Sequence, residues 1–167
     1  FLDTLLPGPY APERKLLLAN RGGRFLDVTA EAGASNPEGK GLGAMTADLD
    51  DDGWPDLFVA NDVSPCALLW NQRDGRFKDV AKAAFVGEER GSMGLALGDF
   101  DGDTKGDVLV SHWVGDIPAL YQRVSRAGRQ PVFQDRARST AMASYPVDMS
   151  GWATAFVDVE NDGQEAL

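Results

Sequence analysis

Cysteine and histidine are almost absent from this 167-residue chain, which contains one of each. The single cysteine, Cys66, excludes an internal disulfide framework and any zinc cluster built from several cysteines. We expect Cys66 to be a small apolar core residue at the end of a strand. The chain also lacks a run of 18 apolar residues, the length that a membrane-spanning helix requires. We therefore expect no transmembrane segment.

Positive charge is also scarce, because 16 Lys and Arg residues are set against 26 Asp and Glu residues. The formal net charge of −10 argues against nucleic acid as a partner, since binding to phosphates needs clustered Lys and Arg. The length fits about one domain, and a hydrophobic content of 43% is sufficient for a packed core. The composition thus indicates one acidic globular domain.

No catalytic constellation is visible around the single histidine. His112 lies just beyond a predicted strand, with Ser111 and Asp116 as the local candidates for a nucleophilic triad. Because adjacent strand residues point to opposite faces, we do not expect Ser111 and His112 to meet. The glycine-rich stretches do not precede a phosphate-binding helix, so nucleotide binding is not indicated. We expect no enzymatic activity and a structural or ligand-contact role for His112.

A nine-residue acidic loop occurs twice, 51 residues apart. Carboxylates occupy positions 1, 3, 5 and 9 of both copies: Asp48, Asp50, Asp52 and Asp56 in the first, and Asp99, Asp101, Asp103 and Asp107 in the second. Four carboxylates that converge on one point repel one another unless a cation lies there. A hard cation with six to eight oxygen ligands fits this set, and calcium is favoured over magnesium, which retains several waters. The loops therefore predict two calcium sites.

The acidic loop differs from an EF-hand, and a third copy of it is incomplete. Position 12 is a valine inside a predicted strand, whereas an EF-hand has glutamate there. The third copy contains Asp158, Glu160 and Asp162, with Ala166 in place of the fourth carboxylate. We expect this copy to be a poor or incomplete metal site. The alternative for all three copies is a solvated turn, because Asp and Gly favour turns.

Each loop belongs to a repeat of about 50 residues that contains four predicted strands. A strand of small residues precedes the loop, an apolar strand follows it, and a short turn joins a third strand to a fourth. The predicted strands are, in this order, 41–47, 91–98 and 150–157; 57–60 and 108–110; 16–20, 67–71 and 119–122; and 25–28, 77–80 and 133–135. Glycine and alanine in the first strand indicate close packing at the centre of a radial fold. The pattern predicts an all-β fold, a β-propeller of four-stranded antiparallel blades.

The repeat divides the chain into about three blades. We expect an N-terminal extension or linker over 1–15, a half blade over 16–40, blades over 41–90 and 91–149, and a partial blade over 150–167. Closed propellers have four to eight blades. We therefore expect an incomplete propeller or a fragment, with its open edges covered by the rest of a longer protein or by another chain.

Aromatic residues recur at fixed places in this repeat, and we expect them in the core. Phe25, Phe77 and Phe133 share one position, and Trp70 is aligned with Tyr121. In this alignment, five of the additional residues of the longer repeat fall in the turn between Tyr121 and Phe133. Insertions in loops are what a repeat architecture requires.

These motifs resemble the FG-GAP or VCBS repeat, which builds integrin-α-like β-propellers. The resemblance rests on the small-residue strand, the acidic loop, Leu-Leu-Trp-Asn at 68–71 and Asp-Gly-Arg-Phe at 74–77. A similar group is that of secreted proteins related to cartilage acidic protein, which often carry an ASPIC/UnbV domain. The resemblance implies calcium in loops on one face, an extracytoplasmic location (secreted, periplasmic or at the cell surface) and a role in adhesion or assembly.

The resemblance also implies further ligands and one departure. The backbone carbonyls of Trp54 and Lys105 match the position-7 ligands of the family's loop. Thr104 replaces the usual glycine at position 6 of the second loop, and we expect Gly102 and Gly106 to supply the turn instead, with weaker binding.

The function that we expect is calcium-stabilised protein–protein contact or assembly in an extracytoplasmic complex. The partner is either another protein or the remaining propeller blades. The alternative is a carbohydrate-binding propeller, alone or as the accessory to a glycan-active enzyme. Trp54, Trp113 and Trp152 lie near loops or strand starts, where they could stack on sugars.

Overall fold

The structure is a computed structural model that describes residues 11–163 and 165. Within these residues the chain forms ten strands and two 3₁₀ helices. In chain order they are β1 (Leu18–Arg21), β2 (Arg24–Asp27), β3 (Gly41–Ala47), β4 (Asp56–Asn61), β5 (Ala67–Asn71), β6 (Phe77–Asp79), β7 (Ser92–Gly98), β8 (Asp107–His112), β9 (Ala119–Arg123), β10 (Phe133–Asp135), η1 (Ala137–Ser139) and η2 (Ala141–Ser144).

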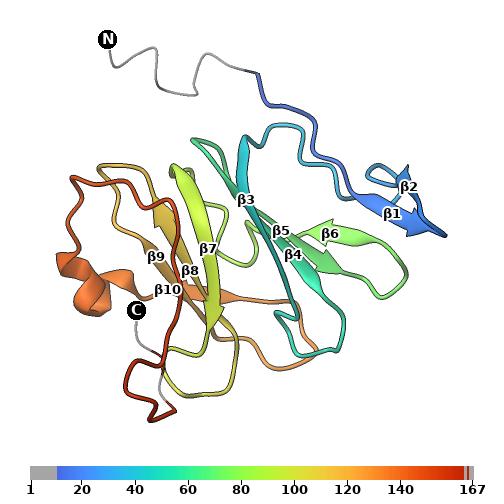
Figure 1. Cartoon of the computed structure of the whole chain (residues 1–167). Helices are drawn as coiled ribbons and strands as arrows, with labels where there is room; N and C mark the ends of the chain where they lie inside the picture. The colour runs from blue at the N-terminus through green and yellow to red at the C-terminus, as the bar shows by residue number, and fades with distance from the viewer. Residues whose placement is uncertain (1–10, 164, 166–167) are drawn as a thin grey trace.

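The strands form three antiparallel sheets that follow the order of the chain. One sheet is β3-β4-β5-β6, the next is β7-β8-β9-β10, and β1 and β2 form a two-stranded sheet. Figure 1 shows the two four-stranded sheets side by side, with β1–β2 beyond β6 and no closed ring. The predicted all-β fold of four-stranded antiparallel blades is confirmed. Among the described residues, neither 3₁₀ helix has the length or the apolar character that crossing a bilayer would need.

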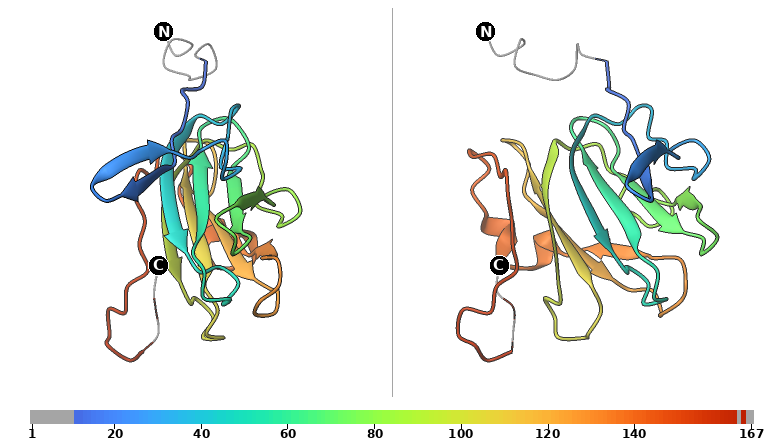
Figure 2. Two further views of the ribbon diagram at one scale, coloured as in Figure 1. Left: turned by 90° about the vertical axis from the view of Figure 1, so that its right-hand side faces the viewer. Right: turned by 45° about the vertical axis from the view of Figure 1, so that its right-hand side comes forward.

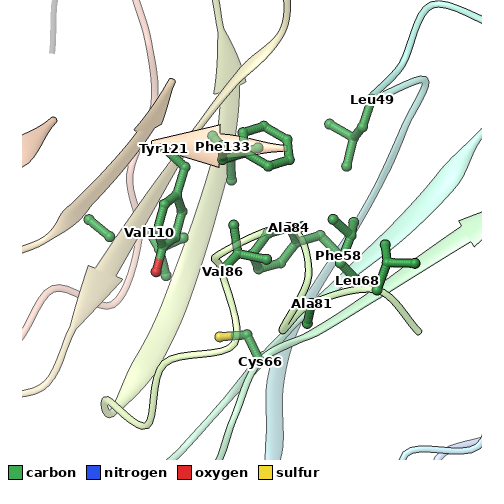
Figure 3. Packing of buried hydrophobic residues seen from close by; sticks show 13 residues of the cluster. Leu49, Phe58, Cys66, Leu68, Ala81, Ala84, Val86, Val110, Tyr121 and Phe133 are labelled. Carbon is green, nitrogen blue, oxygen red and sulfur yellow. The ribbon is translucent and has the colours of Figure 1, made fainter. Parts of the chain in front are cut away.

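The main hydrophobic core lies between the two four-stranded sheets. Phe58 and Leu68 of the first sheet face Val110, Tyr121 and Phe133 of the second, and all of them are buried. Figure 3 shows these side chains converging from both sheets, with Ala84, Val86 and Cys66 between them. Cys66 is buried directly before β5, as expected for a small core residue at a strand end.

The loop after each fourth strand joins one sheet to the next. The amide of Phe77, in β6, donates to the carbonyl of Ala32 at 2.7 Å. The amide of Phe133, in β10, donates to the carbonyl of Ala84 at 3.0 Å. These two hydrogen bonds occupy equivalent places in the repeat, so each loop docks on the outer strand of the following sheet.

The first strands of neighbouring sheets approach so closely that side chains are excluded. β3 and β7 are in contact (Figure 2), and a Cβ on Gly43 would lie 2.4 Å from the carbonyl oxygen of Met93. A Cβ on Gly94 would likewise lie 2.9 Å from the Cα of Ala153. The same packing therefore recurs between β7 and the segment that follows η2. Glycine at these positions has the role that the composition of the first strand predicts.

The segment 150–157 lies at the predicted place but is not the predicted strand. It has no strand residues apart from a single bridge at Val157. A strand needs ladder hydrogen bonds, and the repeat puts the partner strand from position 166 onward, outside the described residues. The helices η1 and η2 were not predicted; they pack Ala137 and Met142 against Leu120.

Two expectations about aromatic residues are wrong. Phe133 is 2% exposed, because the loop of the preceding sheet packs against it through Ala84, whereas Phe25, in the two-stranded β1–β2 sheet, is 66% exposed. Trp70 does not correspond to Tyr121, because Leu57 pairs with Leu69 and Val108 pairs with Tyr121. The connection between β8 and β9 is one residue longer than that between β4 and β5, which shifts the alignment.

The unequal burial of repeat-equivalent phenylalanines gives a direct test. We expect Phe133→Ala to lower the free energy of unfolding by about 3–5 kcal/mol, through lost burial and a new cavity. Phe25→Ala should change it by less than about 0.5 kcal/mol. Urea denaturation of both variants measures the difference. Equal losses would contradict the described packing.

Candidate metal centres

The three acidic loops lie at one edge of the structure. The first connects β3 to β4, the second connects β7 to β8, and the third follows the segment 150–157. Figure 1 shows all three at the lower edge of the sheets. The repeat thus places the acidic loops on one face, as expected.

All three loops share one backbone conformation. Position 4 has a positive φ at Asp51 (55°), Gly102 (74°) and Asn161 (55°). Position 6 also has a positive φ, at Gly53 (88°), Thr104 (67°) and Gly163 (84°). The expectation that Gly102 and Gly106 replace the position-6 glycine is therefore only half correct. Gly102 serves position 4, and Thr104 itself adopts the left-handed conformation, which strains a β-branched residue.

In each loop, the carboxylate of the position-1 aspartate accepts hydrogen bonds from backbone amides of the same loop. Asp48 accepts hydrogen bonds from the amides of Asp52 (3.0 Å) and Gly53 (2.8 Å). Asp99 does the same with Asp103 and Thr104. In the third loop, Asp158 accepts from Asp162 (3.1 Å) and Gly163 (2.8 Å). The turn therefore forms in all three copies, including the one that lacks the full set of aspartates.

The position-9 aspartate ties the loop to the third strand of its sheet. Asp56 accepts from the amide of Leu49 (3.1 Å) and from that of Asn71 (2.8 Å). Asp107 accepts from the amides of Phe100 (3.3 Å) and Arg123 (2.7 Å). Both carboxyl groups are buried, and this desolvation raises the pKa of each to about 6 despite the amide donors. These aspartates are thus part of the sheet framework as well as of the acidic loops.

The position-3 aspartates differ in their surroundings. Asp50 is fully buried and accepts from the Trp70 indole Nε1 at 3.0 Å. Its other oxygen, Oδ1, is buried without a hydrogen-bond partner among the described residues. Burial raises the pKa of Asp50 above its usual value. Asp101 is exposed and accepts from Gln122, which occupies the position of Trp70 in the second sheet.

The position-5 aspartates are each paired with a cationic side chain. The Arg73 Nε lies 2.6 Å from Asp52 Oδ2. In the second loop Lys105 pairs with Asp103, and this hydrogen bond lowers the pKa of the Asp103 carboxyl. The position-7 residues also donate their amides to these aspartates, Trp54 at 2.7 Å and Lys105 at 3.0 Å. That the position-7 carbonyls bind the metal ion remains a prediction.

Two groups of carboxylates are close enough to share an ion. Asp48, Asp50 and Asp52 form one group, and Asp99, Asp101 and Asp107 form the other; within each, one oxygen per residue lies within 4.8 Å of the others. The unpartnered Oδ1 of the buried Asp50 fits a cation in the first loop, because an unpaired carboxylate oxygen is costly to bury. The third loop does not form such a group in the described part of the chain.

The side chains of Ser111 and His112 each hydrogen-bond to the backbone of other segments. The Ser111 hydroxyl donates to the carbonyl of Gly151 (2.6 Å) and accepts from the amide of Gly94 (2.9 Å). The His112 ring is buried, with Nδ1 2.8 Å from the carbonyl of Ile117, and desolvation lowers its pKa. Both side chains are therefore engaged in holding strands and loops together.

The three tryptophans near loops have unequal exposure. Trp54 is 48% exposed in the first acidic loop, and Trp152 is 68% exposed. Trp152 contacts Trp113 edge to face, with ring centroids 6.4 Å apart at an angle of 79°. The Trp113–Trp152 pair belongs to neighbouring repeat units that the fold brings together.

Sequence reasoning missed Arg123. Its side chain is fully buried and contacts Asp51 of the first loop, although the two residues are 72 positions apart. The one available signal is that Arg123 occupies the place of Asn71 in the repeat, which becomes visible only with the corrected alignment of β5 and β9.

Comparison with known proteins supports the repeat. Residues 48–110, which include both complete acidic loops, match the model of the FG-GAP-like repeat family. Cartilage acidic protein 1 from Homo sapiens is 31% identical over 137 residues, which are 81% of this chain and 20% of that protein. Cartilage acidic protein 1 from Mus musculus is 35% identical over 104 residues, which are 62% of this chain and 16% of that protein. The resemblance to FG-GAP repeats is thus confirmed, and the chain spans at most about a fifth of the length of these relatives.

The strained Thr104 predicts a stabilising substitution. Thr104→Gly should raise the free energy of unfolding by about 1 kcal/mol, because glycine adopts a positive φ without steric cost. Gly53→Thr at the equivalent position should lower it, although a Cβ there would meet nothing within 4 Å. Urea denaturation in the presence of a chelator measures both. A loss of stability in Thr104→Gly would show that the conformation is not strained.

Proposed function

We propose, from the FG-GAP-like repeat that residues 48–110 form, that this chain is a calcium-binding β-propeller module for protein–protein contact or assembly. The observation that carries the calcium assignment is the convergence of three carboxylates in each complete loop. Interaction is the role that a repeat-built surface supports best.

The donor set of the loops suits calcium. The first loop offers Asp48, Asp50 and Asp52, all carboxylates, and Asp50 contributes a buried oxygen without another partner. The proposed set is completed by Asp56 and the carbonyl of Trp54. The second loop uses the equivalent Asp99, Asp101, Asp103 and Asp107 with the carbonyl of Lys105. A bound ion would neutralise the mutual repulsion of these carboxylates, which supports a structural role.

The second loop should bind calcium more weakly than the first. Both position-5 aspartates pair with a cation, but Asp52 still belongs to the close group of the first loop, whereas Asp103 does not belong to that of the second. The third loop, with Asp158, Glu160 and Asp162, is proposed to bind weakly or incompletely. Its backbone turn is preformed, but its carboxylates do not converge among the described residues.

An extracytoplasmic location follows from the calcium proposal. Loops of extracellular modules bind calcium in roughly the 0.1–1 mM range, a concentration found outside the cytoplasm. A non-catalytic role is also part of the proposal, supported by the structural hydrogen bonds of Ser111 and His112.

Carbohydrate binding is the second candidate, and one observation favours it. Trp152 exposes 68% of its surface beside Trp113, and exposed indole faces can stack on sugar rings. The same tryptophans also suit a protein interface, where this residue is enriched, and the match to the FG-GAP-like repeat favours protein contact.

Calcium removal tests the principal proposal. Isothermal titration calorimetry of the calcium-free chain should give two bound calcium ions per chain. At a calcium concentration of 100 times its Kd, each site should add about 2.7 kcal/mol to the free energy of unfolding. Asp50→Asn should lower the stoichiometry by one and reduce the calcium-dependent rise in Tm. Asp74→Asn, in the exposed turn before β6, is the matched control and should bind two ions. Absence of binding in the unmutated chain would refute the calcium assignment.

A glycan array separates the two candidate functions. The protein-contact proposal predicts no saturable sugar binding by the calcium-loaded chain. Saturable binding that is lost in Trp152→Ala and kept in Trp54→Ala would favour the carbohydrate function, because these tryptophans lie in different places.

A further inference from the structure

We infer that Arg123 is a positioning residue for the first acidic loop, so that cation affinity at this loop depends on the docking of the next blade. This inference rests on the proposed calcium function. Arg123 belongs to β9 of the second four-stranded sheet, whereas the loop that it contacts belongs to the first.

Arg123 joins the two four-stranded sheets at the first acidic loop. Its side chain is fully buried, its Nη1 donates to the carbonyl of Leu49 at 3.1 Å, and its Nη2 pairs with Asp51. Its own amide donates to Asp107, the position-9 aspartate of the second loop. One residue thus contacts parts of both acidic loops.

These contacts lie on both sides of Asp50, whose carboxylate has the unpartnered oxygen. Leu49 and Asp51 are the neighbours of Asp50 in the chain, and the carbonyl of Asp50 itself accepts from the amide of Gly128 at 2.6 Å. Arg123 is in β9 and Gly128 is in the turn between β9 and β10, so both belong to the second four-stranded sheet. The backbone at Asp50 is therefore held by the neighbouring blade, while its carboxylate is oriented by Trp70 of its own sheet.

In the described part of the chain, the second loop has no equivalent contact with an arginine side chain of the next unit. Asp101 is exposed, and its carboxylate accepts a hydrogen bond from the Gln122 side chain of the same sheet. A later segment contacts the second loop through the hydrogen bond from the Asp99 amide to the Glu165 carboxylate at 2.7 Å, which brings a negative group. The buried Asp50 and the exposed Asp101 thus differ in the support that the next unit gives.

Electrostatics alone would make an arginine unfavourable beside a cation site. Arg123 is paired with Asp51, however, and Asp51 is not one of the three grouped carboxylates of the first loop. The pair is close to neutral, so its net repulsion of a bound cation is small. What remains is the fixed orientation of the loop, and outer-shell partners of metal ligands typically affect metal affinity 10–100-fold.

Terbium luminescence combined with calcium competition measures the first loop separately. Excitation of tryptophan sensitises bound terbium, and Trp54 and Trp70 lie in or against the first loop, whereas the second has Lys105 and Gln122 at these positions. The luminescence comes from the first loop if Asp50→Asn removes it and Asp101→Asn leaves it unchanged. Calcium titrations by calorimetry then give the affinity of each loop in Arg123→Met and Arg123→Lys. Arg126→Met removes the same charge from an exposed side chain in the turn between β9 and β10 and is the control.

We expect Arg123→Met to weaken calcium binding at the first loop at least tenfold and to leave the second loop within twofold. Arg123→Lys keeps the charge but cannot reproduce both contacts, so it should be intermediate; Arg126→Met should match the unmutated chain. If Arg123→Met fails to fold by circular dichroism, the lysine variant decides. Unchanged first-loop affinity in folded variants overturns the inference, as does an equal loss at both loops. Absence of calcium binding in the unmutated chain would instead overturn the proposed function.

Discussion

The burial of the central strands on both faces of each four-stranded sheet is the constraint on which this structure depends. Every residue of β8 is buried, and β4, β5 and β9 are almost as enclosed. A sheet of this kind exposes too much apolar surface to be stable alone, so each must pack against a neighbour. The core between the two four-stranded sheets and the docking of the 80–86 loop on β10 satisfy that need.

This packing brings the first strands together at their glycines and lines up the acidic loops at one edge. The loops then concentrate negative charge where the sheets meet. Part of that charge is balanced locally, by backbone amides at Asp48 and Asp56 and by the cations Arg73 and Arg123. The buried Oδ1 of Asp50 has no such partner among the described residues, which is why the first loop is the stronger candidate for a calcium ion.

Metal binding and blade packing are consequently linked in our interpretation. A ligand that favours one arrangement of the loop also favours the contacts that hold that arrangement. Arg123 and Gly128 hold the first loop from the neighbouring sheet, so a cation at Asp50 would stabilise the junction between blades as well as the hairpin. A propeller module whose blades are locked in this way presents a rigid surface to a partner, which reduces the entropy lost on binding.

The sequence by itself determined the four-strand repeat, the hairpins, the close approach of the glycine-rich strands and the place of the acidic loops. These features depend on local spacing and on residue types with strong backbone preferences. The tertiary structure alone decided the different surroundings of residues that occupy the same place in the repeat. Phe25 is exposed and Phe133 is buried, Asp50 is enclosed and Asp101 is open, and Arg123 reaches a loop 72 positions away. The physical reason is that burial and long-range ion pairing depend on which neighbouring blade covers a residue. A local sequence pattern does not predict that contact.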